Sequence, residues 1–477
     1  MHISILETGA LPDGKTPATA AIETAIRRVA DAGGGTVVVP AGDFLTGMVR
    51  LRSHVELHLA RGARLKAAPQ PEDHHPWVQL PASGDHWHKN EPSFHLVCAI
   101  ACEDVAISGP GELDGHGPAF YDPVEPGTAW PLARHRDSRR MGGLVMFHAC
   151  RDVTVRDCRM GNVCNWTLVF SECDAVRVRD VIIRNPHQAP NSDGIDIVGC
   201  RDVSISGCHI DTGDDAICLK TLPQGRSCEN VNVTHCVIQS HCAALKLGAS
   251  ESFQDMRHVT FSNCVVRGSH RVVALYSLEG AMMEHILVQN ISFDTCAALM
   301  FTRPIHVDIR RKSPESRLGG LRFLTISGMS GETNGRSLFT CETGGVLSDL
   351  VLRDLSISLP TFDDPALQGR EHGGGQFSSK TPNARVVRAA FVFENAERVT
   401  LNGLHLRWPD NQTPPSAWTF TSKLANGTER LFTPEDWTLA ADTPVHVLAL
   451  RNVKDSQFQI GTLQGWQGGT PITEYTA

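Results

Sequence analysis

Two neighbouring segments of the sequence carry a concentration of aspartates that could divide acid and base roles. They read Asn191-Ser192-Asp193-Gly194-Ile195 and Gly213-Asp214-Asp215-Ala216-Ile217. Aligning the isoleucines that end them places Asp193 beside Asp215, so the three carboxylates would meet where two adjacent strands begin. Because their charges repel, one carboxyl would be pushed to a raised pKa while its neighbours stay ionised. One protonated and one ionised carboxyl are what the hydrolysis of a glycosidic bond requires.

Two other interpretations of the aspartates stay open. Aspartates in turns accept hydrogen bonds from nearby backbone amides, and Asp196 and Asp211 suit that structural role. Clustered carboxylates on strands can also bind calcium. We favour catalysis for Asp193, Asp214 and Asp215, because three converging carboxylates are a costly way to build turns. We therefore expect no metal and no cofactor.

The elements that would position these aspartates follow from an internal repeat. Short segments in which β-branched and polar residues alternate begin roughly 23 to 28 residues apart, within the range of solenoid repeats. The alternation predicts strands with one face inward, stacked as a parallel β-solenoid. The clear copies are Val153–Cys158, Val176–Val181, Val203–Cys208, Val231–Cys236, Val259–Cys264 and Ile286–Ile291, and fainter ones begin at Val105, Leu324, Val351 and Val399.

The cysteines fall into register with this repeat. Of the 15 in the chain, one group precedes the first valine of its repeat by three residues and another follows it by five. Equivalent positions on successive turns stack about 4.8 Å apart, so we expect two ladders of small buried thiols. The short paired spacings of zinc sites do not occur, whereas disulfides between facing ladders stay open. The ladders comprise Cys102, Cys150, Cys173, Cys200 and Cys228, and Cys158, Cys208, Cys236 and Cys264.

The N-terminal segment predicts a helix that covers the open end of the solenoid. Ile22, Ile26 and Val29 lie at helical spacing behind Thr16 and Thr19, which suit an N-cap. A terminal turn otherwise exposes its core and its unpaired edges. The predicted fold is therefore all-β: a single-stranded, right-handed parallel β-helix with an N-terminal capping helix. Its first strands would be Thr36–Val39 and Val55–Leu59.

We expect residues 1–477 to form a single β-helix domain. Residues 1–45 would hold the cap and first strand, 46–360 the main turns, and 361–477 a long loop and C-terminal strands. The loop is indicated by Thr361–Pro382, which is polar and rich in Gly and Asp. Strand patterns resume after it, but they leave open whether the C-terminal part adds turns or folds over one face.

Composition and charge exclude several classes of partner. The 477 residues carry a formal net charge of -8, with both signs mixed and no basic run. Nucleic acid and anionic membrane surfaces are therefore not expected partners. No apolar stretch reaches the length of about 18 residues that predicts a transmembrane helix. The N-terminus lacks a charged segment followed by an apolar one, so either the protein is not exported by that route or a signal has been removed.

The aspartate motifs, set within a predicted β-helix, make the sequence similar to glycoside hydrolase family 28, the polygalacturonase group of pectin-degrading enzymes. The similarity extends over most of the chain. Asn191-Ser192-Asp193-Gly194 followed by Gly213-Asp214-Asp215 carries it most specifically. Further segments that resemble the family are Thr8–Thr16, Gly33–Gly42, Ser108–Gly115 and Asn165–Leu168.

The resemblance implies a role for each of the three aspartates. Asp214 would be the general acid, while Asp193 and Asp215 would position and deprotonate the water, which gives inversion. Carboxylates one turn apart are closer to the separation of about 5 Å expected of retaining enzymes. Asp214 lies one residue out of register with the other two, and we follow the family in expecting inversion.

The sequence departs from the family where a substrate carboxylate would bind. The family's Gly-His-Gly is replaced by Cys242-Ala243-Ala244, with His241 in a predicted turn beside it, and its Arg-Ile-Lys by Val273–Tyr276. Lys246 would point outward from its strand and could replace the missing cation, although a solvated or ion-paired lysine is the alternative. Trp166 could stack on a sugar ring or belong to the core. The candidate substrate-binding residues are Lys246, Asn191, His241, Arg271, Arg303, Tyr276 and Trp166.

The sequence therefore predicts an inverting glycoside hydrolase that acts on a pectin-type, uronic-acid-containing oligo- or polysaccharide. The polar loop around Trp87 could close one end of a groove and restrict the enzyme to chain ends. A β-helix polysaccharide lyase or uronan epimerase is the alternative enzyme. A non-catalytic carbohydrate-binding β-helix is the third interpretation.

Overall fold

The computed structural model describes residues 1–81, 91–122, 141–295, 302–333, 335–359, 389–408, 420–423, 429–432, 446–466 and 468–475. These residues divide into two compact units. Unit 1 runs from Met1 to Ile238 and unit 2 begins at Gln239. The expectation of a single domain stays a prediction.

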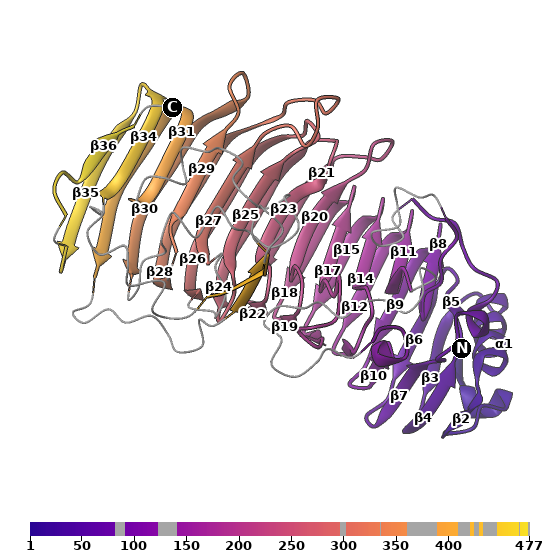
Figure 1. The fold of residues 1–477 in the computed structure, drawn as a ribbon. Helices are drawn as coiled ribbons and strands as arrows, with labels where there is room; N and C mark the ends of the chain where they lie inside the picture. The colour runs from indigo at the N-terminus through magenta and orange to yellow at the C-terminus, as the bar shows by residue number, and fades with distance from the viewer. Residues whose placement is uncertain are drawn as a thin grey trace. The chain divides into compact units, whose positions relative to one another are not determined.

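Unit 1 is a parallel β-helix whose turns contribute three strands each (Figure 1). The strands form three stacked rows: β5–β8–β11–β14–β17–β20, β3–β6–β9–β12–β15–β18–β21 and β4–β7–β10–β13–β16–β19. Their bounds are β1 His2–Ser4, β2 Asp13–Pro17, β3 Gly35–Val39, β4 Gly42–Thr46, β5 Val49–Arg50, β6 Val55–Leu59, β7 Ala63–Ala67, β8 Val97–Ile100, β9 Glu103–Ser108, β10 Glu112–Asp114, β11 Gly143–His148, β12 Arg151–Arg156, β13 Arg159–Gly161, β14 Trp166–Ser171, β15 Asp174–Arg179, β16 Ile182–Arg184, β17 Ile195–Val198, β18 Arg201–Ser206, β19 His209–Thr212, β20 Ile217–Thr221 and β21 Cys228–Thr234, with β22 (Val237–Ser240) at the boundary.

The register of unit 1 confirms the repeat. Val153 pairs with Val105 on one side and Val176 on the other, and Val176 continues through Val203 to Val231. All five valines are almost fully buried. The period-2 alternation therefore locates the inward face of each strand in this row.

Strands of this row contain a residue in the left-handed region near their start, where the chain bends. The φ angle is 53° at Asp152, 57° at Asp202 and 58° at Asn230, the residues just before three of the buried valines. Asp and Asn adopt this conformation at lower cost than other non-glycine residues. The recurring Arg-Asp-Val triplet is thus a bend followed by an inward strand residue.

Unit 2 continues the same kind of fold with longer strands. Its parallel rows are β23–β25–β27–β29–β31–β34–β36 and β24–β26–β28–β30–β31–β35, and β32 and β33 form an antiparallel pair. The bounds are β23 Ala243–Ser252, β24 Met256–Val266, β25 Arg271–Ser277, β26 Met282–Thr295, β27 Arg303–Ile309, β28 Gly320–Thr333, β29 Ser337–Cys341, β30 Val346–Ser358, β31 Ala389–Arg407, β32 Phe420–Lys423, β33 Glu429–Phe432, β34 His446–Lys454, β35 Gln457–Gln464 and β36 Ile472–Glu474.

The repeat copies of unit 2 are confirmed with one correction. Val259, Ile286 and Leu324 pair in succession, and Leu324 continues to Leu350 rather than to Val351. The start predicted at Val351 was therefore wrong by one residue, because the leucines of this strand, not its valine, face inward. The C-terminal strands β34 to β36 pair in parallel with β31 or with each other, so they add turns.

The predicted cap is present at the N-terminal end of unit 1. Helix α1 (Thr19–Asp31) buries Ile22, Ile26 and Val29 and contacts β1, β3 and β5. Short 3-10 helices also occur at Ile5–Thr8, Pro71–His74 and Gly117–Ala119. The threonine caps were wrong: the N-cap is Ala18, whose side chain accepts no hydrogen bond. Thr16 instead donates to Asp13 within β2, since the strand extends to Pro17.

The fold is an all-β, right-handed parallel β-helix with a capping helix. No helix among the described ranges is long and apolar enough to span a membrane. The segments predicted as a long loop at Thr361–Pro382 and as a groove-closing loop around Trp87 lie outside the described residues.

The cysteine ladders lie in the core. The Cys102 amide donates to Cys150 Sγ at 3.4 Å and the Cys173 amide to Cys200 Sγ at 3.3 Å, which links neighbouring turns. All fourteen cysteines that the structure describes are buried, and none of them forms a disulfide. Burial raises the pKa of Cys158 to about 12 and that of Cys228 to about 11. These thiols are therefore neutral and inert at neutral pH.

Thiol titration checks this arrangement. Since 14 of the 15 cysteines are described and all of those are buried, the native protein should release at most one equivalent of chromophore from a disulfide reagent at pH 8. Addition of denaturant should bring the count to 15. Rapid reaction of several thiols in the native protein would contradict the assignment of the ladders to the core.

Candidate active site

The register of β17 on β20 brings the aspartate motifs together within unit 1. Ile195 pairs with Ile217, as the sequence alignment predicts. Just before these strands, the Gly194 amide donates to the carbonyl oxygen of Asp215 at 2.8 Å. Asp193 and Asp215 therefore occupy adjacent turns at the same strand start.

Asp193 is a buried carboxylate on a rigid backbone. Its side chain is 4% exposed. Its carbonyl oxygen accepts the Thr167 amide at 3.0 Å and the Thr167 hydroxyl at 2.6 Å. Asn185 donates to that hydroxyl oxygen at 2.8 Å and to the Ser192 carbonyl oxygen at 3.1 Å. Thr167 of β14 and Asn185, which follows β16, thus fix the orientation of the Asp193 backbone.

Asp214 and Asp215 sit on a tight turn that leads into β20. The Asp215 amide donates to Asp214 Oδ1 at 2.9 Å, and the Thr212 hydroxyl donates to the Asp214 carbonyl oxygen at 2.6 Å. The preceding Gly213 is packed so closely that a Cβ there would lie 2.5 Å from the carbonyl oxygen of His187. Asp214 is half-buried, whereas Asp215 is buried. Asp214 is therefore the most accessible carboxylate of the three.

Lys220, which the sequence analysis did not select, contacts the same cluster. It lies in β20, and its Nζ is 2.8 Å from Asp193 Oδ2 and 2.6 Å from Asp196 Oδ1. The ammonium also stands 3.5 Å from the centroid of the Trp166 ring, a cation–π contact. Trp166 itself is 3% exposed and packs in a cluster of buried apolar residues. A stacking role for Trp166 on sugar stays a prediction.

The turn-making roles expected of Asp196 and Asp211 were wrong. Asp196 lies inside β17 and is fully buried against Lys220. Asp211 lies in β19, and its Oδ1 is 2.6 Å from His187 Nε2. Both carboxylates are paired with side chains because both lie in strands, where the neighbouring backbone amides are engaged in the parallel rows.

The electrostatics of the cluster centre on Asp193. Burial raises the pKa of this carboxyl well above its usual range, the Lys220 ammonium opposes the rise, and Asp196, Asp214 and Asp215 add to it. The pKa of Asp193 is thus raised, whereas the family resemblance gives the acid role to Asp214. A raised pKa strengthens a carboxylate as a base, provided that it still ionises at the working pH.

The candidate substrate cations lie in unit 2. Arg271 of β25 pairs in register with Arg303 of β27, and their exposures are only 4% and 1%. Lys246 of β23 alternates with two inward leucines and is 3% exposed, which excludes the solvated lysine. All three candidate cations are therefore buried.

Two further candidates in unit 2 contact histidines. The Tyr276 hydroxyl is 2.8 Å from His306 Nδ1. His241 stacks on His270, with 5.4 Å between the ring centroids. Asn191, in unit 1, adopts a φ of 49° at the turn before Asp193. Substrate binding by these residues stays a prediction.

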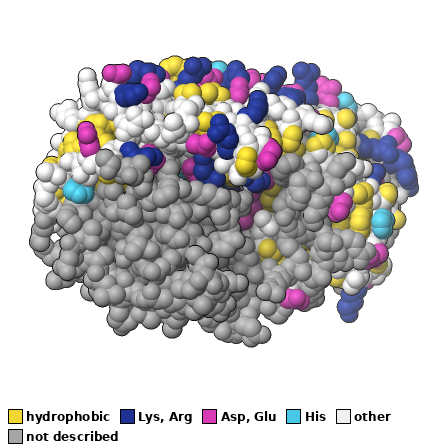
Figure 2. Space-filling view, turned by 45° about the horizontal axis from the view of Figure 1, so that its top comes forward, with side chains coloured by type: hydrophobic (Ala, Val, Ile, Leu, Met, Phe, Trp, Pro, Cys, Tyr) yellow, Lys and Arg dark blue, Asp and Glu magenta, His cyan; other side chains and the backbone are white. Residues whose placement is uncertain are grey.

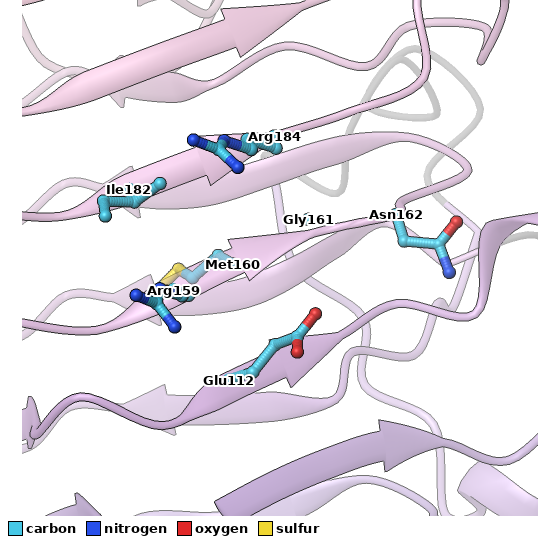
Figure 3. Close-up of a pocket in the computed structure, with 7 residues that line it drawn as sticks. All are labelled: Glu112, Arg159, Met160, Gly161, Asn162, Ile182 and Arg184. Carbon is cyan, nitrogen blue, oxygen red and sulfur yellow. The ribbon is translucent and has the colours of Figure 1, made fainter. Parts of the chain in front are cut away.

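A surface cavity of about 420 Å³ opens over β10, β13 and β16 of unit 1 (Figure 3). Glu112 and the exposed Arg159 and Arg184 contribute charged groups to it. None of the aspartates of the cluster lines it. On the face drawn in Figure 2, the described acidic and basic side chains are interspersed, in agreement with the absence of a basic run in the sequence.

Comparison with known proteins places this chain in a family. The family model "Glycosyl hydrolases family 28" matches residues 34–358. An endo-polygalacturonase of Pectobacterium parmentieri is 21% identical over 321 residues, which cover 66% of this chain and 77% of that protein. The chain therefore belongs to glycosyl hydrolases family 28, and the protein is a glycoside hydrolase.

Two solved structures share the fold. An exopolygalacturonase from Thermotoga maritima gives a TM-score of 0.62 at 24% identity, with 75% of this chain and 87% of that chain covered. A family 28 exopolygalacturonase from Yersinia enterocolitica gives 0.61 at 15% identity, with 96% and 78% covered. Both comparisons support the β-helix assignment.

Proposed function

We propose that the protein hydrolyses a glycosidic bond in a pectin-type, uronic-acid-containing oligo- or polysaccharide, with inversion and from chain ends. The observation that carries the proposal is the convergence of Asp193 with Asp214 and Asp215 at one strand start. Family membership supports the inverting course. The two exopolygalacturonases with similar folds support action at chain ends.

In the proposed reaction, Asp214 protonates the glycosidic oxygen while its bond to the anomeric carbon breaks. Asp193, supported by Asp215, takes a proton from water, and the oxygen of that water bonds to the anomeric carbon from the opposite face. One proton leaves Asp214 and one reaches Asp193, so the site regains its starting state by proton exchange with solvent. The half-buried position of Asp214 suits contact with a leaving sugar.

A screen of defined pectic oligosaccharides tests the proposal. Hydrolysis should release reducing ends without the ultraviolet absorbance of a new double bond, and mono- or disaccharide products should appear from the first time point. NMR of the fresh product should show the anomer opposite to that of the substrate. An absorbing, calcium-dependent product would indicate a lyase, and binding without turnover would indicate a carbohydrate-binding protein.

Lys246→Ala tests the proposed replacement cation. Because a hydrogen bond to a charged group is worth about 1.5–3 kcal/mol, we expect KM for an anionic oligosaccharide to rise about tenfold or more with little change in kcat. KM for the methyl-esterified oligosaccharide, which lacks the carboxylate charge, should not change. Lys246→Arg serves as the charge-retaining control, and an unchanged KM in the alanine variant removes Lys246 from substrate binding.

A further inference from the structure

The buried ion cluster of unit 1 contains one cation with no part in the proposed reaction. The side chains of Lys220, Asp193 and Asp196 are 4%, 4% and 0% exposed. Removing three charges from water costs several kcal/mol per ion unless the geometry is good. A β-helix with a fully apolar row at this place would avoid that cost, so the cluster calls for a functional explanation.

The geometry divides the Asp193 carboxylate into two oxygens with different surroundings. Oδ2 accepts from the Lys220 ammonium at 2.8 Å. Oδ1 is buried and accepts no hydrogen bond from any residue that the structure describes. With its backbone oxygen fixed by Thr167, the carboxylate is held with one oxygen bound to the ammonium and the other without such a partner.

Lys220 is in turn held by two other groups. Asp196 Oδ1 lies 2.6 Å from its Nζ, and the Trp166 ring lies 3.5 Å away. The ammonium therefore cannot swing away from Asp193 without losing three contacts at once. The charged groups that act on Asp193 in unit 1 are Lys220 and Asp196 together with Asp214 and Asp215.

We propose that Lys220 is a positioning residue for hydrolysis: its ammonium holds Asp193 Oδ2 and keeps this carboxylate ionised, so that Oδ1 can take the proton from water. This inference rests on the proposed function. Asp196 has the opposite influence, because it shares the ammonium and adds a negative charge beside Asp193. Burial alone favours the neutral form of the Asp193 carboxyl, which cannot act as a base.

The two neighbours of Asp193 should therefore shift the acidic limb of the pH profile of kcat/KM in opposite directions. Removing the cation in Lys220→Met should move the limb upward by about 1 pH unit or more. At a pH below the limb, this variant should lose at least about tenfold more activity than on the plateau. Removing the anion in Asp196→Asn should move the limb downward. Lys220→Arg should keep the limb close to that of the wild-type enzyme.

An equal loss of activity at every pH in Lys220→Met, with an unmoved limb, overturns the proposal, since a merely structural lysine would behave in that way. If Lys220→Met does not fold, the shift of the acidic limb in Asp196→Asn tests the proposal instead: a downward shift supports it, and an upward shift or none rejects it. Failure of the proposed function is recognised separately by infrared titration of the Asp193 carboxyl, using the difference from Asp193→Asn. A higher midpoint in Lys220→Met than in the wild-type protein supports the inference even without a substrate, and equal midpoints reject it.

Discussion

Asp214→Asn should lower kcat on a pectic oligosaccharide by about 10²–10⁴-fold, the range that a general acid contributes. The amide can accept the Asp215 backbone hydrogen bond at Oδ1 as the carboxyl does, but it has no proton to give to the leaving oxygen. Steady-state kinetics with the purified variant measures the loss. The melting temperature should stay near that of the wild-type protein, because Asp214 is only half-buried.

The leaving group distinguishes an acid from a general loss of the site. An aryl uronide, whose phenolate departs without protonation, should be hydrolysed by Asp214→Asn with a much smaller deficit than the oligosaccharide. Asp211→Asn is the matched control, since Asp211 lies on the same segment but pairs with His187. Near-normal turnover of the oligosaccharide by Asp214→Asn removes Asp214 as the acid.

Asp193→Asn should also lower kcat by about 10²–10⁴-fold, because the water loses its base. In contrast to Asp214→Asn, the aryl uronide should be affected as strongly as the oligosaccharide. Azide, a nucleophile that needs no deprotonation, should restore turnover of the aryl substrate and give the azide of inverted configuration. If azide does not restore the turnover of Asp193→Asn, and the aryl uronide is hydrolysed with a much smaller deficit than the oligosaccharide, then Asp193 is the acid and Asp214 the base.

The same variant should be more stable than the wild-type protein at pH 7. Burial raises the pKa of Asp193, so the folded state favours the neutral carboxyl. The resulting penalty to folding grows as pH rises from the unfolded-state pKa to the higher folded-state pKa and stays constant above it. The amide is neutral at every pH, and Lys220 keeps Asp196 as its partner. We expect a melting temperature about 2 °C higher at pH 7.

The difference in melting temperature between Asp193→Asn and the wild-type protein should shrink as pH falls. It should vanish below about pH 4, where Asp193 is protonated in both the folded and the unfolded chain. Scanning calorimetry or circular dichroism across this range measures the difference. A lower melting temperature for Asp193→Asn at pH 7 contradicts the view that the buried carboxylate is held at a cost to the fold.

The β-helix could be predicted because its information is local and periodic. Each turn repeats the same bend residue, such as Asp152 or Asp202, followed by alternating inward residues. Slipping a strand by one residue would bury polar side chains, so the hydrophobic pattern fixes the register. The error at Val351 arose where leucines at odd and even positions made both registers plausible.

The backbone of the candidate site was predictable for the same reason, whereas its charge network was not. Ile195 over Ile217 sets Asp193 beside Asp215. Lys220 pairs in register with Val198, and its contact with Asp193 depends on the path of a long side chain back along the strand. The one available signal was that Lys220 follows the apolar run Ala216–Leu219, where a lysine is unusual unless paired.

The links between strand rows have a consequence for how the candidate site can change. Because successive turns stack by short-range strand pairing, the links between rows can differ in length: residues 185–194 before β17 are ten, whereas 162–165 before β14 and 213–216 before β20 are four each. The links 185–194 and 213–216 carry the three catalytic candidates. Changes there would act on the candidate site more directly than on the paired strands of the rows. The residues proposed for catalysis and the residues that set the strand register thus lie in separate parts of each turn.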